Sequence, residues 1–419
     1  MSRALDVHLH DLRAGELVQA DDGALTFAYV DSYLTSRGAR AISVSMPLRQ
    51  ASWPDRVARP FFSGLLPDGD ARQRLAGRLG ISAANTFGLL EVIGGECAGA
   101  LSLHPQGKTS LQDDGEEVEP LRGERLANVL GRLHDRPLLG GEDGVRLSLA
   151  GAQDKLAVCI ESGEIGLAKG GRATTHILKP AIRALEGTVE NELFCLRLAR
   201  RMKLAAPEAV MREAEGTPFL LVERYDRRQG RNGTIERLHQ EDFCQALSVP
   251  PELKYEDEGG PGTESSLGLI QRATARPAAE RLAFIRMLIF DFLVGNADAH
   301  AKNFALLYRE KVPDLAPPYD VVCTAVYPRL AQRLAMAIGG RNIPDTIRLD
   351  HWLKLVPPVR SARQLLVKDL MQMASRIEVE ADAVRVDLDT EGVGHAILDR
   401  VRAIIASRAA HILRITHDG

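Results

Sequence analysis

The segment Gly295-Asn-Ala-Asp-Ala-His-Ala-Lys-Asn303 decides how this chain is interpreted, because it is a polar run directly after a long apolar stretch. It places Asp298 five positions before Asn303, and a second aspartate follows at Asp320. A phosphoryl-transfer site needs one carboxylate to accept a hydroxyl proton, and an Asn and an Asp to hold magnesium. The spacing therefore predicts a catalytic loop with Asp298 as proton acceptor and with Asn303 and Asp320 as Mg²⁺ ligands.

The sequence around this loop indicates how the fold would present it. Apolar residues recur with helical spacing over 278–294, and Gly295 is a natural end for that helix. Two short extended pieces, 303–308 and 315–322, are joined by a segment of turn composition, and a hairpin there would carry Asp320 back toward Asp298. His300 lies in the same loop, where a hydrogen bond or a positive charge would stabilise a transferring phosphate.

Three segments upstream carry the pattern of a nucleotide site. Small residues in 150–155 would let backbone amides approach phosphate, although a plain hairpin turn has the same composition. Lys179, in the predicted strand His176-Ile-Leu-Lys-Pro180, would meet the α- and β-phosphates, unless its ammonium simply reaches solvent. The strand that ends in Glu223-Arg-Tyr-Asp226 could bind an adenine edge, with Tyr225 beside the ring, or could merely surface there.

Composition limits the classes of function. The 419 residues are 45% apolar, enough for more than one core, and 53 basic against 56 acidic residues give a formal charge of -3. Such a chain has no global positive field for nucleic acid or anionic membrane. Five scattered cysteines without a C-x-x-C pair argue against a disulfide framework and a cysteine zinc site. With no apolar window of 18 residues and no basic, apolar leader, we expect a soluble bacterial cytoplasmic protein without membrane association.

Periodicity indicates a β-rich N-terminal part and a mostly α-helical C-terminal half, and the joint occurrence of the motifs in this order favours an α+β, protein-kinase-like two-lobed fold. Its β-rich N-terminal lobe would have an extra N-terminal subdomain, and its C-terminal lobe would be mostly α-helical. The expected boundaries are 1–105 for the subdomain, 106–226 for the ATP-binding part and 227–419 for the helical lobe, with a polar linker at 106–119. Strands are expected at 5–9, 24–30, 42–46, 156–160 and 176–180, and a buried strand that runs into a charged segment is expected at 218–226. Helices are expected at 70–79 with Asp70 as N-cap and an end near Gly80, and at 187–203, 241–247, 278–294, 362–376 and 392–415.

Taken together, the motifs resemble the HipA-type serine/threonine kinases. The resemblance rests on Ser148-Leu-Ala-Gly-Ala-Gln-Asp-Lys155, the Lys179 strand, Glu223-Arg-Tyr-Asp226, the segment 295–303 and Tyr319-Asp320. Phe61-Phe-Ser-Gly-Leu-Leu-Pro67 and Gly94-Gly-Glu-Cys-Ala-Gly-Ala100 are similar to the N-terminal subdomain of that family. The resemblance thus spans nearly the whole chain. It departs from eukaryotic kinases, because H-R-D, D-F-G and A-P-E triplets are missing and His300 stands where those enzymes have lysine.

The resemblance implies roles for individual residues. Asp298 would be the proton acceptor, Asn303 and Asp320 would ligate Mg²⁺, and Ser148 would be an autophosphorylation site that switches the kinase off. The residues implied to contact ATP are Ala150, Gly151, Ala152, Gln153, Asp154, Lys155, Lys179, Glu223, Arg224, Tyr225, His300, Asn303, Tyr319 and Asp320. A phosphate beside a phosphate-binding loop would repel ATP and displace that loop. Either Glu190 or Glu192 of the predicted helix could pair with Lys179.

The resemblance also implies partners. Family members are toxins of two-gene toxin–antitoxin modules, so a small helix-turn-helix antitoxin (HipB-like) would neutralise this chain and tether it indirectly to operator DNA. The expected protein substrate is an aminoacyl-tRNA synthetase, with glutamyl-tRNA synthetase as a guess, whose phosphorylation arrests growth and promotes persistence. Two alternatives stay open. One is a catalytically silent kinase fold that acts as a corepressor with its antitoxin, and the other is a metal-dependent hydrolase that uses Asp298, His300 and Asp320 as ligands.

Overall fold

The computed structural model describes residues 2–107, 117–142, 144–230 and 234–417. The chain forms two compact units, each built from separate segments. Unit 1 comprises 1–180, 212–252 and 306–313, and unit 2 comprises 181–211, 253–305 and 314–419. The predicted division at 105 and 226 stays a prediction.

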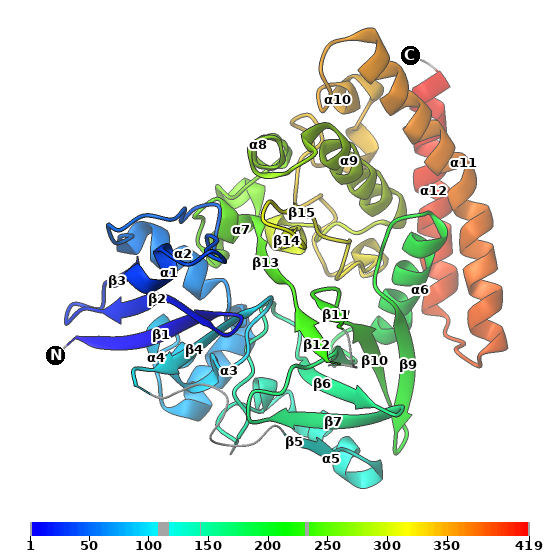
Figure 1. Ribbon diagram of the computed structural model, residues 1–419. Helices are drawn as coiled ribbons and strands as arrows, with labels where there is room; N and C mark the ends of the chain where they lie inside the picture. Colours follow the sequence, from blue (N-terminus) through cyan, green and yellow to red (C-terminus); the bar gives the residue numbers. More distant parts are fainter. Residues whose placement is uncertain (1, 108–116, 143, 231–233, 418–419) are drawn as a thin grey trace. The chain divides into compact units, whose positions relative to one another are not determined.

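Unit 1 begins with an antiparallel four-stranded sheet in the order β3-β2-β1-β4 (Figure 1). Alternate residues of β1, namely Leu5, Val7 and Leu9, are buried in the core, as a strand with one covered face requires. The strands are β1 (Arg3–Leu9), β2 (Leu12–Gln19), β3 (Leu25–Tyr29) and β4 (Leu101–Pro105). The helices of this part are α1 (Asp31–Leu34), α2 (Asp55–Ser63), α3 (Gly69–Leu79) and α4 (Thr86–Ile93).

Two expectations in this region are wrong. Residues 42–46 form no strand, because Tyr29 binds both ends of the segment. Its hydroxyl donates to the Met46 carbonyl at 2.6 Å and accepts from the Ile42 N–H at 2.9 Å, which holds the segment as a turn. Helix α3 has Asp68 and not Asp70 at its N-cap, although its predicted end at the left-handed Gly80 is confirmed.

The second sheet of unit 1 has six strands in the order β5-β7-β6-β8-β10-β9, and β9 begins at the end of a segment of unit 2. Strand β5 (Glu117–Pro120) pairs with β7, so the linker expected at 106–119 is wrong for its last residues, whereas 108–116 lie outside the described residues. The other strands of this sheet are β6 (Leu156–Glu161), β7 (Glu164–Lys169), β8 (His176–Pro180), β9 (Ala209–Ala214) and β10 (Thr217–Glu223). The expected strands at 156–160 and 176–180 are thereby confirmed, whereas the strand expected at 218–226 ends at Glu223.

Smaller elements complete unit 1. A helix, α5 (Gly123–Arg132), follows β5, and β11 (Arg227–Gln229) pairs antiparallel with β12 (Ile235–Arg237). The last elements are β13 (His239–Asp242), α7 (Phe243–Ala246) and β14 (Ala305–Tyr308), of which β14 starts with the last residue of a unit 2 segment. Helix α7 is shorter than the expected 241–247, because Asp242 caps its N-terminus by accepting from the Gln245 N–H.

Unit 2 is mostly helical. Helices α11 (Arg360–Thr390) and α12 (Ile397–His417) lie side by side in Figure 1, and α6 (Thr188–Arg201) packs on both. The remaining helices are α8 (Thr263–Ala273), α9 (Pro277–Val294) and α10 (Leu349–Leu353). The expected helices at 187–203 and 278–294 are confirmed, whereas α11 is much longer than 362–376. The extended piece expected at 315–322 is wrong beyond Leu315, where β15 (Asp314–Leu315) ends.

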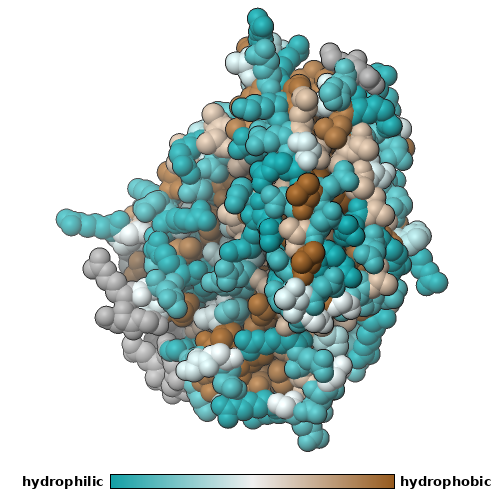
Figure 2. Space-filling view, turned by 90° about the vertical axis from the view of Figure 1, so that its right-hand side faces the viewer, coloured by the Kyte–Doolittle hydropathy of each residue, from teal (hydrophilic) through white to brown (hydrophobic). Residues whose placement is uncertain are grey.

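One face of the molecule is mostly hydrophilic. Figure 2 views the side on which α11 lies in Figure 1 and shows a mostly hydrophilic face with scattered apolar residues. Two of the exposed apolar residues of α11 are Val379 and Val386. Within the described residues, no helix combines the length and apolarity that crossing a membrane requires. All five cysteines are buried free thiols.

Candidate active site

In unit 2, hydrogen bonds at the end of α9 hold the catalytic loop predicted at 295–303. Helix α9 stops at Gly295, whose φ of 74° is left-handed, and a Cβ there would lie 2.7 Å from Ile404. The Asn296 side chain donates to Asp291 Oδ1 at 2.9 Å and accepts from the Asp298 N–H at 3.2 Å. Burial raises the pKa of Asp291 to about 7. Asp291, which lies in an otherwise apolar turn of α9, therefore anchors the loop through Asn296.

Asp298 is exposed and has neighbours suited to a proton acceptor. Its Oδ1 accepts a hydrogen bond from the Tyr255 hydroxyl at 2.9 Å, and its backbone carbonyl accepts from Asn303 Nδ2 at 3.3 Å. Desolvation by surrounding protein raises the pKa of Asp298, the charge of Asp320 raises it further, and Tyr255 and Lys254 oppose the rise. The electrostatic influence of Asp320 agrees with the prediction that the chain brings the two carboxylates together.

Asp320 itself has an unusual backbone. Its φ of 56° places a residue other than glycine in the left-handed region, which aspartate tolerates better than most residues but which still costs energy. The preceding Tyr319 donates its hydroxyl to the Lys302 carbonyl at 2.6 Å and so fastens this segment to the catalytic loop. The strained backbone conformation thus occurs at a predicted metal ligand, where it would fix the direction of the carboxylate.

His300 is a buried, neutral imidazole in this structure. Burial lowers its pKa to about 3, and the nearby charges of Lys254 and Lys302 act in the same direction. Its Nδ1 has no hydrogen-bond partner among the described residues, and its ring meets the Tyr255 ring edge-on at 5.1 Å between centroids. Of the two roles considered for His300, a neutral hydrogen-bonding group fits this environment better than a cation does.

The predicted phosphate loop, residues 150–155, belongs to unit 1 and is held at both ends. Lys155 Nζ donates to the Ala150 carbonyl at 2.8 Å, and this contact needs Gly151, since a Cβ there would lie 2.5 Å from that ammonium. Asp154 accepts from Arg74 at 2.6 Å and contacts His134 Nδ1 at 2.9 Å. Gln153 reaches the Pro180 carbonyl at 3.4 Å, whereas Ala152 is exposed at the tip.

Lys179 lies in the second half of β8, opposite Leu220 of β10, and is 6% exposed. A buried lysine in a central strand is the arrangement expected of a residue that meets nucleotide phosphates. Glu223 ends β10 with its side chain exposed, and the Tyr225 hydroxyl bonds to Gln240. Because Lys179 lies in unit 1 and Glu190 and Glu192 lie in unit 2, their pairing stays a prediction.

The Arg224 guanidinium is part of a buried ionic network. Its guanidinium donates to Asp226 through Nε at 2.9 Å and Nη2 at 2.8 Å, and through Nη1 to Thr174 Oγ1 at 2.9 Å. Glu96, from the motif 94–100, accepts from Arg227 at 2.7 Å in the same network. While this network is intact, the Arg224 guanidinium therefore does not make the predicted contact with adenine.

Ser148, the predicted modification site, is fully buried. Its hydroxyl donates to the Leu65 carbonyl at 2.7 Å, and its N–H donates to the Glu96 carbonyl at 2.8 Å. Both anchors come from the two N-terminal motifs, 61–67 and 94–100. A kinase could reach this hydroxyl only after the segment leaves its present position.

The predicted residues thus fall into two groups. Asp298, His300, Asn303, Tyr319 and Asp320 are gathered in unit 2, and the predicted nucleotide residues up to Tyr225 are in unit 1. Sequence reasoning missed Lys254 and Tyr255, which contact the catalytic loop. The available signal was weak: a lone aromatic residue between Pro250-Pro251 and the turn-rich Gly259-Gly260-Pro261-Gly262.

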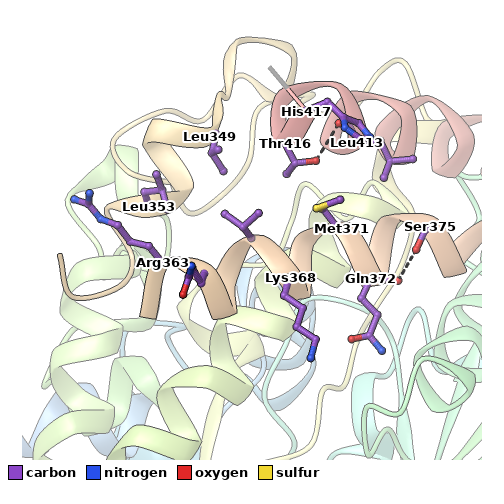
Figure 3. Close-up of a pocket in the computed structure, with 12 residues that line it drawn as sticks. Leu349, Leu353, Arg363, Lys368, Met371, Gln372, Ser375, Leu413, Thr416 and His417 are labelled. Atoms are coloured by element: carbon purple, nitrogen blue, oxygen red, sulfur yellow. Dashed lines mark hydrogen bonds between the residues drawn. The ribbon is translucent and has the colours of Figure 1, made fainter. Parts of the chain in front are cut away.

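Unit 2 also has a groove of about 940 Å³ that contains none of these residues. Figure 3 shows Leu349 and Leu353 of α10, Met371 of α11 and Leu413 of α12 around it. Lys368 of α11 also lines the groove. The groove lies between three helices, and polar residues such as Arg363, Gln372 and His417 line it beside the apolar ones.

Two family profiles match the chain. The one described as the HipA-like C-terminal domain matches residues 147–385, more than half of the chain, and the one described as the HipA N-terminal domain matches residues 5–104. The chain belongs to the HipA family. As a HipA-type protein it is a serine/threonine protein kinase of the toxin family, and the predicted α+β, protein-kinase-like fold is confirmed.

Individual relatives support this family assignment. The protein named "Putative kinase Y4mE" from Sinorhizobium fredii is 40% identical over 395 residues, which cover 92% of this chain and 94% of that protein. The serine/threonine-protein kinase toxin HipA of Shewanella oneidensis is 30% identical, with coverage of 89% and 87%. A chain from the solved complex of Shewanella oneidensis HipA, HipB and operator DNA superposes with a TM-score of 0.81 at 25% identity, covering 99% and 98%.

Proposed function

We propose that this HipA-type chain is an ATP- and Mg²⁺-dependent kinase that phosphorylates serine or threonine on a protein of the translation machinery and thereby arrests growth. The observation that carries the proposal is the arrangement around Asp298 in unit 2. Asn303 binds the Asp298 carbonyl, and Asp320 is near enough to influence the Asp298 carboxylate electrostatically. Both observations support the set that spacing alone predicts.

The chain's own residues suit the parts of phosphoryl transfer. Asp298 would accept the proton of the substrate hydroxyl, since it is exposed and the Tyr255 hydroxyl orients its carboxylate. The neutral His300 would offer a hydrogen bond to a phosphate oxygen. In unit 1, Lys179 and the loop 150–155, with Gly151 at its bend, would hold the phosphates, and Glu223, Tyr225 and the backbone of Arg224 would frame adenine. Tyr319 would hold the segment that carries Asp320.

The donor atoms fit a magnesium ion. Asn303 uses its side-chain N–H on the Asp298 carbonyl, which leaves the amide oxygen for a cation, and Asp320 adds a carboxylate in a fixed backbone conformation. Mg²⁺ prefers oxygen ligands of this kind and, when bound, would neutralise charge on the phosphates. Among the described residues, no three His, Cys, Asp or Glu side chains are grouped to hold a metal. This weighs against the hydrolase alternative with Asp298, His300 and Asp320 as a ligand triad.

Phosphorylation of Ser148 would be the off switch of the kinase. The hydroxyl is buried against the Leu65 carbonyl, so a phosphate with nearly two negative charges does not fit in the present arrangement. Modification would hold the segment 148–155 away from its place and remove the phosphate loop. The toxin would thereby inactivate itself.

The partners we propose are a small helix-turn-helix antitoxin and, through it, operator DNA. Support comes from the similarity to a chain solved with HipB and operator DNA, and from a formal charge of -3 that gives this chain no DNA-binding field of its own. For the substrate we keep an aminoacyl-tRNA synthetase, with glutamyl-tRNA synthetase as the first to test. Growth arrest by such a kinase would promote persistence.

Intact-mass measurement after incubation with ATP and Mg²⁺ tests the proposal. We expect added phosphate on the wild-type chain or on glutamyl-tRNA synthetase, its loss with EDTA, and none with Asp298→Asn or Asn303→Ala. Absence of phosphate on both proteins, with Asp298→Asn indistinguishable from wild type, would instead support the silent corepressor. A comparison of phosphopeptides after brief expression of active and Asp298→Asn chains would identify the target.

A further inference from the structure

The segment Lys254-Tyr255 contacts the catalytic loop. The Tyr255 hydroxyl donates to Asp298 Oδ1 at 2.9 Å, and its ring meets the His300 ring edge-on, with an interplanar angle of 80°. One side chain therefore touches both the predicted proton acceptor and the predicted phosphate-contacting histidine. All three residues lie in unit 2.

The backbone around Tyr255 is fixed in place. The Lys254 carbonyl accepts from the Ala301 N–H at 3.3 Å, and the Tyr255 carbonyl accepts from the Gly260 N–H at 2.9 Å. Gly260 is required there, because a Cβ would lie 1.9 Å from the Leu253 carbonyl oxygen. Lys254 Nζ lies 5.4 Å from the centroid of the Tyr255 ring, within reach of a cation–π attraction. The Tyr255 hydroxyl is thus held by a segment whose backbone is fixed by hydrogen bonds.

We propose that Tyr255 is a positioning residue for the phosphoryl transfer, because its hydroxyl fixes the rotation of the Asp298 carboxylate. A carboxylate has two oxygens, each able to accept more than one hydrogen bond. With Oδ1 held by Tyr255 and the residue still exposed, Oδ2 is directed to accept the proton of a substrate hydroxyl. Proton acceptors must stand within hydrogen-bond distance in the correct orientation, so a carboxylate free to rotate would lose rate.

This inference rests on the proposed function, since it assigns a role within that reaction. An opposite role for the same bond can be tested alongside it. If the Tyr255 hydroxyl merely filled the place of the substrate hydroxyl, its removal would free Asp298 and make the enzyme faster. A positioning role makes the enzyme slower at saturating substrate and leaves ATP binding alone.

Tyr255→Phe separates these outcomes, because it removes the hydroxyl and keeps the ring against His300. The readout is the rate of phosphate incorporation into the chain itself at varied Mg²⁺-ATP, together with titration of a fluorescent ATP analogue. We expect the maximal rate to fall about tenfold or more, with the half-saturating ATP concentration and the analogue Kd changed less than about twofold. Tyr255→Ala, which also removes the ring, should be slower still.

Tyr33→Phe is the matched control, since that hydroxyl donates to the Arg40 carbonyl at 2.9 Å in unit 1. It should keep the wild-type rate, and both Phe variants should stay folded, with a loss in free energy of unfolding of about 1 kcal/mol at most. A Tyr255→Phe chain that is as fast as wild type, or faster, overturns the positioning role while the proposed function stands. A wild-type chain that places phosphate neither on itself nor on glutamyl-tRNA synthetase overturns the proposed function, and the inference with it.

Discussion

Glu96 and Arg227 form an ion pair in unit 1, with Oε1 and Nη2 2.7 Å apart and both side chains 3% exposed. The same Oε1 accepts from the Thr174 N–H at 3.1 Å and from its hydroxyl at 3.0 Å. Burial by itself would raise the pKa of Glu96, but the charges of Arg237 and Arg227 outweigh it, and the pKa lies below its usual value. The N-terminal motif 94–100 is therefore tied by charge to the residues that follow β10.

Glu96→Ala should strongly destabilise the protein. It leaves the buried guanidinium groups of Arg224 and Arg227 without one of their two carboxylates, and breaking such a pair from one side costs about 3–5 kcal/mol. Urea unfolding would measure this loss. Glu91→Ala is the control, since Glu91 pairs with Arg3 at the surface, and it should lose at most about 1 kcal/mol. Equal losses in the two variants would contradict the importance of the buried network.

Glu241 should make stability depend on pH. It is buried in unit 1, accepts from the Val44 N–H at 2.9 Å and the Tyr308 hydroxyl at 2.5 Å, and burial raises its pKa to about 7. The folded protein therefore binds this proton more tightly than the unfolded chain does. Its stabilising contribution is full below about pH 4.5 and is lost as pH rises to about 7, at about 1.4 kcal/mol per pH unit.

Glu241→Gln tests this pH dependence, because the amide oxygen still accepts both hydrogen bonds but does not titrate. The free energy of unfolding of the variant, measured in urea from pH 4.5 to 7, should decline less with rising pH than that of wild type. Parallel pH profiles would show that Glu241 does not titrate in this range.

Arg74→Ala should weaken ATP binding without unfolding the protein. Arg74 holds Asp154 of the loop 150–155 at 2.6 Å, and a partly exposed pair of this kind contributes about 1 kcal/mol at most, equivalent to about a fivefold rise in Kd. Titration with a fluorescent ATP analogue measures the change. Arg122→Ala breaks an exposed pair with Glu164 elsewhere in unit 1 and should leave the Kd unchanged.

Ser148→Ala should abolish phosphate on this segment and leave transfer to a protein target intact. It should also lower the free energy of unfolding by about 1 kcal/mol, because the Leu65 carbonyl loses its hydrogen bond. Peptide mapping after incubation with Mg²⁺-ATP locates the phosphate. Self-inactivation of the variant at the wild-type rate would exclude Ser148 as the switch.

The sequence by itself determined the local elements with strong periodicity and the identity of the chemical groups. Helix α9 ends at Gly295 as predicted, because only a residue that tolerates left-handed φ fits there. The order and spacing of Asp298, Asn303 and Asp320 indicated the chemistry, since a magnesium-dependent transfer requires these side-chain types. Local pattern failed at 42–46, where the distant Tyr29 and Glu241 hold the chain as a turn instead of a strand.

Only the tertiary structure decided which groups touch one another. No spacing predicts that Tyr255, 43 residues before Asp298, donates to its carboxylate, or that Glu96 joins Arg227 across 131 residues. Protonation was equally a tertiary property: burial makes His300 neutral and raises the pKa of Asp291 and Glu241 to about 7. The physical reason is the same in each case. Hydrogen bonding and desolvation depend on neighbours in space, whereas sequence patterns report only neighbours along the chain.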